Sequence, residues 1–160
     1  MYVPLISLLV ACGTRPAAPP SPTLDPSAQS TTPARATLLS EQGRLSELFR
    51  GTPVTFTMQV DGSMRATVPR VFSFDAGAIK VKPPLAAVLD RLSKSQLQSA
   101  SRLRVSTPSD TGKPGSALAR DRALSVRDYL MGQGIAPTRL QANGVAQTEH
   151  VEIVLSESAR

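Results

Sequence analysis

The stretch from residue 53 to 68 constrains the fold more than any other segment of the chain. Apolar side chains occupy every second position from Val54 to Val60 and again from Met64 to Val68, with Asp61-Gly62 between the two runs. A period of two is typical of a strand with one buried face, and Asp-Gly between two such runs favours a tight hairpin. The segment therefore predicts a β-hairpin whose apolar face must be covered by another layer.

Two amphipathic helices and further strands are expected after the hairpin. Pro83-Pro84 suits the first turn of a helix whose buried face runs from Leu85 to Leu92. A second helix is predicted from about Ser116 to Met131, followed by two glycines that end it. Alternation predicts strands near 103–107 and 151–155, and Phe72 and Phe74 suggest one more. This order predicts an α/β fold, a two-layer βαβαβ sandwich with its helices on one face of the sheet.

Residues 1–11 have the composition of an export signal. The run from Val3 to Ala11 is almost wholly apolar, and it is far shorter than the ~20 residues that a bilayer span needs. It ends in Leu9-Val10-Ala11-Cys12, which resembles the lipobox of bacterial lipoproteins. The resemblance implies a lipidated Cys12, and the following Gly13 implies an outer-membrane anchor facing the periplasm. Cys12 is the only cysteine, so no disulfide within the chain is possible.

Residues 12–44 are rich in Pro, Ala, Ser and Thr. Because this range has few apolar side chains, the free energy of burying them cannot offset the entropy lost on ordering the backbone. A disordered tether is therefore expected over this range. The stretch from Thr37 to Phe49 carries leucines at helical spacing and could form a short helix. The folded domain is accordingly expected over residues 45–160, with the hairpin of residues 53–68 at its start.

The charge and the polar residues exclude several classes of function. The formal net charge is +6, from 18 Lys and Arg against 12 Asp and Glu, but the basic residues are scattered and no aromatic residues lie between them. A solvated basic surface is therefore expected, and no nucleic-acid partner. The chain has no nucleophile elbow, phosphate loop or Cys/His cluster, and its one histidine, His150, suits a strand edge. We expect neither an enzyme nor a bound metal or cofactor.

Several motifs in the second half of the chain match one known family. Residues 118–130 read Leu-Ala-Arg-Asp-Arg-Ala-Leu-Ser-Val-Arg-Asp-Tyr-Leu, and Gly134-Ile135 follows. The segments 71–75, 79–83, 143–144 and 151–155 also fit the family pattern. On these motifs, residues 71–155 resemble the OmpA-like C-terminal domain, a periplasmic module of many outer-membrane proteins and lipoproteins.

The resemblance implies a site for the diaminopimelate of peptidoglycan. Family members hold this ligand with an aspartate in a Gly-His-Thr-Asp loop and an arginine in an Asn-Arg-Arg segment before the last strand. Here the loop is residues 106–112, in which Asp110 takes the place of the aspartate if about three residues have been lost. Thr148-Glu149-His150 stands where the arginine would be, so the expected cation is missing there.

Arg122 is the other candidate site residue. At helical spacing it shares the apolar face of its helix with Val126 and Tyr129. Burying its charge without a partner would cost several kcal/mol, so we expect it to be compensated. It could join the helix to the 108–115 loop through an ion pair or backbone carbonyls, or it could face a ligand carboxylate. Asp110 is its natural partner in either case.

Two functions remain open on the sequence. The first is a non-catalytic, outer-membrane-anchored scaffold that binds other proteins of a secretion, conjugation or motor assembly in the cell envelope. The second is a peptidoglycan-binding tether that uses Asp110 and a substitute cation. An arginine or lysine next to Asp110 in the folded site would favour the second function.

Overall fold

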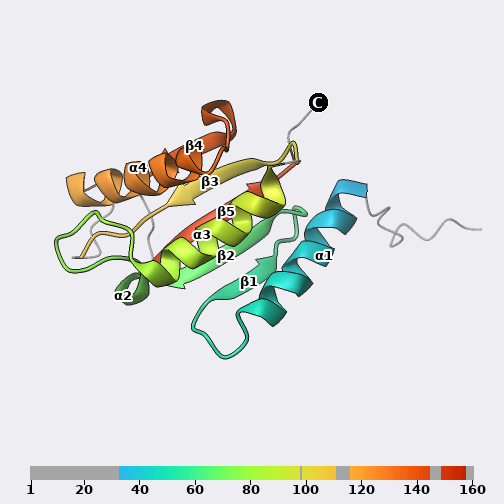
Figure 1. The fold of residues 1–160 in the computed structure, drawn as a ribbon, viewed down its shortest axis with the longest axis horizontal. Coiled ribbons are helices and arrows are strands. Elements are labelled where there is room, and N and C mark those ends of the chain that lie inside the picture. Colours follow the sequence, from blue (N-terminus) through green and yellow to red (C-terminus); the bar gives the residue numbers. More distant parts are fainter. Residues whose placement is uncertain (1–32, 98, 111–115, 145–148, 158–160) are drawn as a thin grey trace, which may run out of the picture. The chain divides into compact units, whose positions relative to one another are not determined.

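A mixed β-sheet with helices on one face makes up the folded part of the chain (Figure 1). The computed structural model describes residues 33–97, 99–110, 116–144 and 149–157. Within these ranges the strand order is β1-β2-β5-β3-β4; β3 and β4 are parallel, and the other neighbours are antiparallel. The strands are β1 (Thr55–Met58), β2 (Met64–Pro69), β3 (Arg102–Ser106), β4 (Leu140–Asn143) and β5 (His150–Ser156).

The predicted hairpin is confirmed as β1 and β2. Phe56 pairs with Ala66, and the loop closes where the Gln59 N–H donates to the Ser63 carbonyl over 2.8 Å. Gly62 adopts a φ of 83°, in the left-handed region that glycine occupies without steric cost. The connection is thus the three-residue hairpin loop that ends in a left-handed glycine.

The helices supply the second layer. They are α1 (Pro33–Leu48), α2 (Arg70–Ser73), α3 (Pro83–Gln96) and α4 (Ala117–Gly132), with a 3-10 turn η1 at Pro137–Arg139. The two longer helices predicted from the sequence are confirmed as α3, with proline in its first turn, and α4. The Ser116 hydroxyl caps α4 by accepting the Ala119 N–H at 3.1 Å. Among the described helices, none carries an apolar run long enough to cross a bilayer.

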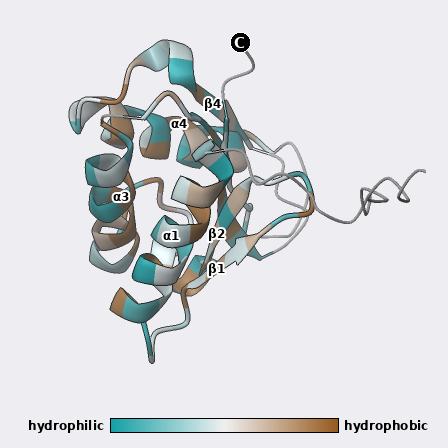
Figure 2. Ribbon diagram, turned by 90° about the vertical axis from the view of Figure 1, so that its right-hand side faces the viewer, coloured by the Kyte–Doolittle hydropathy of each residue, from teal (hydrophilic) through white to brown (hydrophobic). Residues whose placement is uncertain are grey.

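The hydrophobic core lies between the sheet and these helices. Figure 2 shows α1 and α3 on one side of β1 and β2, and the core side chains of the strands alternate toward that side. Every core residue of the described part of the chain falls between Leu38 and Leu155, so the compact unit of residues 31–160 contains this core. The α/β, two-layer architecture expected from the sequence is therefore confirmed.

The prediction of a disordered tether as far as Arg44 is wrong for residues 33–44, which belong to α1. The short helix expected from Thr37 is present but begins earlier. Leu38 and Leu45 are 3% and 0% exposed, so packing on the sheet stabilises this helix. Residues 1–32, with Cys12 and the rest of the predicted tether, lie outside the described residues.

Two further details differ from the sequence prediction. The strand expected at Phe72 and Phe74 is absent: Pro69 ends β2, and residues 70–73 form the single turn α2. The Ser73 hydroxyl closes this turn by donating to the Pro69 carbonyl at 3.0 Å. Conversely, the pattern did not predict β4, because Leu140 is its only large apolar residue.

Candidate functional site

The topology brings two strand ends together at one edge of the sheet. Strands β2 and β3 both pair antiparallel with β5, so they run in the same direction and their carboxyl ends lie at the same edge. Arg70 follows β2, and the loop from Thr107 to Asp110 follows β3. Helix α4 presents Arg122 to the same place.

Asp110 is the centre of this site, and its carboxylate is bound from three sides. Oδ1 lies 2.7 Å from Arg122 Nη2 and 3.1 Å from Arg70 Nη1, and Oδ2 accepts the Gly77 N–H. The Gly77 amide, followed by the charges of Arg122 and Arg70, holds the pKa of Asp110 below its usual value against the opposing effect of burial. The side chain keeps 24% of its surface exposed, so an ionised carboxylate is available at the surface.

Arg122 is completely buried. Its Nε donates to the Ala78 carbonyl at 2.9 Å, its Nη1 to Pro108 at 3.1 Å and its Nη2 to Asp75 at 3.0 Å. Its guanidinium also lies over the Phe74 ring, 4.9 Å from the centroid. The expected compensation of its charge is confirmed, because Arg122 makes both the ion pair and the carbonyl contacts. It ties α4 to the loops that follow α2 and β3.

Arg70 is the site residue that sequence reasoning missed. Its side chain is 21% exposed and reaches Asp110 across a separation of forty residues in the chain. Its backbone N–H donates to the Glu149 carbonyl at 3.0 Å, and Pro69 pairs with His150. Arg70 therefore lies beside the segment where the family resemblance led us to expect an arginine. No local pattern could have identified it, because only the β2–β5 pairing brings it there.

The segment that departs from the family pattern supplies no cation of its own. Glu149 is exposed and His150 is half-buried at the start of β5, while Thr148 lies outside the described residues. Arg70, Arg122 and Asp110 together carry a formal charge of +1. Among the described residues, no group of three His, Cys, Asp or Glu side chains could hold a metal ion.

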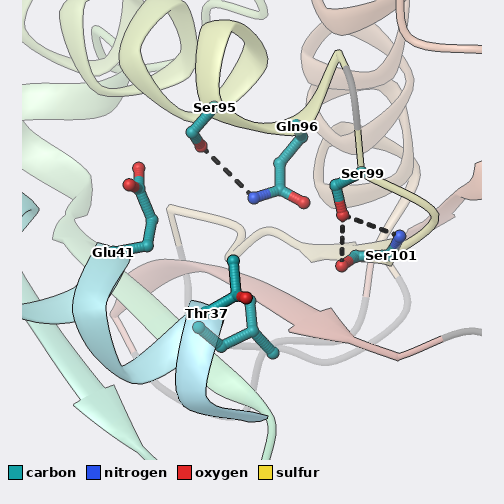
Figure 3. A pocket seen from close by; sticks show the side chains of 7 residues that line it. Thr37, Glu41, Ser95, Gln96, Ser99 and Ser101 are labelled. Atoms are coloured by element: carbon teal, nitrogen blue, oxygen red, sulfur yellow. Dashed lines mark hydrogen bonds between the residues drawn. The ribbon is translucent and has the colours of Figure 1, made fainter. Parts of the chain in front are cut away.

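A separate hollow of about 370 Å³ lies between α1 and the end of α3 (Figure 3). Gln96 donates its side-chain amide to the Ser95 hydroxyl, and the hydroxyls of Ser99 and Ser101 lie 2.7 Å apart. The one carboxylate in the lining, Glu41, already binds Arg44. The described lining contains neither histidine nor cysteine, so it offers hydrogen bonds but no pair suited to nucleophilic catalysis.

No family model and no curated protein match this chain. Solved structures do match it. A MotB-like protein from Desulfovibrio vulgaris aligns with a TM-score of 0.64 at 19% identity, over 78% of this chain and 95% of that one. The periplasmic domain of Helicobacter pylori MotB aligns with a TM-score of 0.55 at 19% identity, over 68% of this chain and 85% of that one. The cell wall anchor of the T6SS from Pseudomonas aeruginosa aligns with a TM-score of 0.52 at 18% identity, over 77% of this chain and 96% of that one.

The described domain has the OmpA-like fold. At these identities the likeness concerns the fold alone. The resemblance inferred from the motifs is confirmed at that level. It also extends further than the motifs did, because a match over 78% of the chain cannot be confined to residues 71–155.

Proposed function

We propose that this chain is a non-catalytic protein of the bacterial cell envelope whose OmpA-like domain binds peptidoglycan from the periplasmic side. The observation that carries the proposal is Arg70 beside Asp110, the substitute cation that the peptidoglycan hypothesis requires. The likeness to a protein described as a cell wall anchor supports the same assignment.

Asp110 and Arg70 would divide the ligand between them. Diaminopimelate carries an ammonium and a carboxylate on the same carbon. The ionised, partly exposed carboxylate of Asp110 suits the ammonium, and the guanidinium of Arg70 suits the carboxylate through paired hydrogen bonds. Arg122 is buried and fully engaged, so it acts as a positioning residue that holds the Asp110 loop in place.

Co-sedimentation with purified sacculi tests the proposal. We expect Arg70→Ala to lower the bound fraction at least about tenfold, as the loss of one charged hydrogen bond does, with little change in melting temperature. Arg91→Ala, on the exposed side of α3, is the matched control and should bind as the wild type does. A soluble peptide containing diaminopimelate should compete with the sacculi. Wild-type protein that stays in the supernatant, or Arg70→Ala that binds normally, would contradict the proposal.

A scaffold role in an envelope assembly is the second candidate, and an apolar hollow favours it. A cavity of about 330 Å³ lies where α1 ends and α3 begins, and Phe49, Phe72 and Pro84 are among its lining residues. Phe72 and its neighbour Val71 are 41% and 57% exposed, so apolar surface adjoins this cavity. If a protein partner binds there, Phe72→Asp should abolish its co-purification while leaving the binding to sacculi unchanged.

We further propose that Cys12 carries the lipid that anchors the chain in the outer membrane. The lipobox-like Leu9-Val10-Ala11-Cys12 supports this assignment. The intact mass of protein extracted with detergent from its native host should correspond to a chain that starts at Cys12 and carries acyl groups. Cys12→Ser should release the protein from the membrane fraction. An unprocessed wild-type chain would contradict the anchor.

A further inference from the structure

The face of the sheet opposite the helices, here called the open face, is covered by no helix of the described part of the chain. Along β2, Met64, Ala66 and Val68 point into the core, so Arg65 and its alternate neighbours point the other way. The same alternation holds in β3 and β5. Within the described part of the chain, the outward side chains of the five strands are exposed or half-exposed, and none is Phe, Tyr or Trp. Figure 2 shows α1 and α3 on the other side.

Three arginines form a triangle on this open face. Arg65 and Arg104 both pair with Val154 of the strand between them, so two strand spacings, about 10 Å, separate their backbones. Arg102 lies two residues before Arg104 on the same side of β3, about 7 Å along the strand. The apolar Val154 occupies the space between Arg65 and Arg104.

The open face is basic. Glu152 is the only acidic side chain among the outward residues of the described strands, and its Oε1 lies 3.9 Å from Arg65 Nη1, the limit of an ion pair. The Arg104 Nε contacts the uncharged Gln141 at 3.4 Å. The Arg65 Nε is buried with no hydrogen-bond partner in the described structure. Three guanidinium groups against one carboxylate leave a formal surplus of two positive charges.

We propose that this open face docks on an anionic phospholipid bilayer. A bilayer presents phosphates over a plane, and a flat triangle of guanidinium groups can meet it with all three members at once. A single extended acidic peptide presents its charges along a line, which suits two of the three positions. Single-stranded nucleic acid binds through stacking aromatics, and the described strands present none outward.

The inference is independent of the proposed cell-wall site. Asp110 and Arg70 lie at the carboxyl ends of β2 and β3, whereas the triangle lies on the broad face of the sheet. The two surfaces therefore use different residues. Failure of either contact in an experiment leaves the other to be judged separately, since one is measured with vesicles and the other with sacculi.

Vesicle flotation with residues 31–160 tests the docking surface, because this fragment contains the whole core and omits the apolar leader. The vesicles are phosphatidylcholine alone or with 30% phosphatidylglycerol, at about 0.05 M and 0.5 M salt. The test variant combines Arg65→Glu, Arg102→Glu and Arg104→Glu. The control variant makes the same change in net charge at exposed residues on the helical side, with Lys80→Glu, Arg91→Glu and Lys94→Glu. Far-UV circular dichroism checks that both variants fold.

We expect the wild type to float only with the anionic vesicles and to lose this binding at high salt, since the contact is electrostatic. The open-face variant should bind at least tenfold less and the helical-side variant within about twofold of the wild type. Equal losses in the two variants would show attraction by net charge alone and would overturn the proposal. So would an absence of wild-type binding to anionic vesicles, including the case in which soluble polyglutamate binds instead.

Discussion

Arg122 Nη2 lies 2.7 Å from Asp110 Oδ1, although the side chain of Arg122 has no exposed surface. A buried guanidinium is tolerated because it also donates to the carbonyls of Asp75, Ala78 and Pro108. Those carbonyls belong to segments that have no regular secondary structure to order them. The buried side chain of Arg122 therefore holds the two loops of the candidate site in position through these hydrogen bonds.

Removing Arg122 should destabilise the domain strongly. Arg122→Ala removes the donor of three backbone carbonyls and one of the three partners of the Asp110 carboxylate, and we expect a loss of about 3–5 kcal/mol in the free energy of unfolding. Arg122→Lys should recover only a small part, because one ammonium cannot reach all of these acceptors. Urea unfolding measures both. A loss below about 1 kcal/mol for Arg122→Ala would show that the contacts contribute little.

The two site residues should be energetically coupled. Asp110→Ala should cost less than Arg122→Ala, because Arg122 retains its three carbonyl partners. The double variant should be clearly less destabilised than the sum of the two single losses, as residues in direct contact are. The same urea experiment on the four proteins gives the coupling free energy. Additive losses would contradict the pairing of Asp110 with Arg122.

Asp110 should make the domain sensitive to acid. Its pKa is lowered in the folded state, chiefly by the Gly77 amide and then by Arg122 and Arg70. Its stabilising contribution is therefore complete above the ordinary carboxyl pKa of about 3.9 and is lost as the pH falls through the lower folded-state value. Melting curves between about pH 6 and pH 2 should show a smaller acid-induced loss in Asp110→Asn. Asp121→Asn, on the exposed side of α4, should keep the wild-type pH profile.

Gly144 should not tolerate a side chain. A Cβ at this position would lie 2.3 Å from the backbone nitrogen of Arg120 and 2.6 Å from the carbonyl carbon of Ala119, so helix α4 would have to shift. We expect Gly144→Ala to cost about 1–3 kcal/mol, as overpacking does. Gly43→Ala is the matched control: its Cβ would meet nothing within 4 Å in α1, and the change should stabilise by about 0.5–1 kcal/mol. Thermal melts of the two variants should shift in opposite directions.

Helix α1 should be an integral part of the domain. Leu45 is 0% exposed and Leu48, one turn later in the same helix, is 48% exposed. Leu45→Ala should therefore cost about 2–5 kcal/mol, whereas Leu48→Ala should change stability by less than about 0.5 kcal/mol. Chemical denaturation compares the pair directly. Equal small effects would mean that the domain does not depend on α1.

The amino-acid sequence was sufficient where a local pattern repeats. The alternation around Asp61-Gly62 predicted the hairpin, and the prolines at 83–84 and the serine at 116 marked the starts of α3 and α4. Period-two alternation likewise predicted β3 and β5, which form the centre of the sheet. Each of these signals lies within a few residues of the element that it predicts, because strand and helix periodicity are properties of the local backbone. The charge of Arg122 in an apolar stripe was also visible, and so was the need to compensate it.

The tertiary structure decided what depends on distant partners. Helix α1 is stabilised because Leu38 and Leu45 pack on the sheet. Strand β4 forms because it pairs with β3. Arg70 reaches Asp110 only because β2 and β3 both pair with β5 and so end at the same edge of the sheet. A contact between residues forty positions apart produces no recognisable spacing or periodicity in the sequence. The contact forms only after the strands have paired, because the paired sheet sets the positions of both residues.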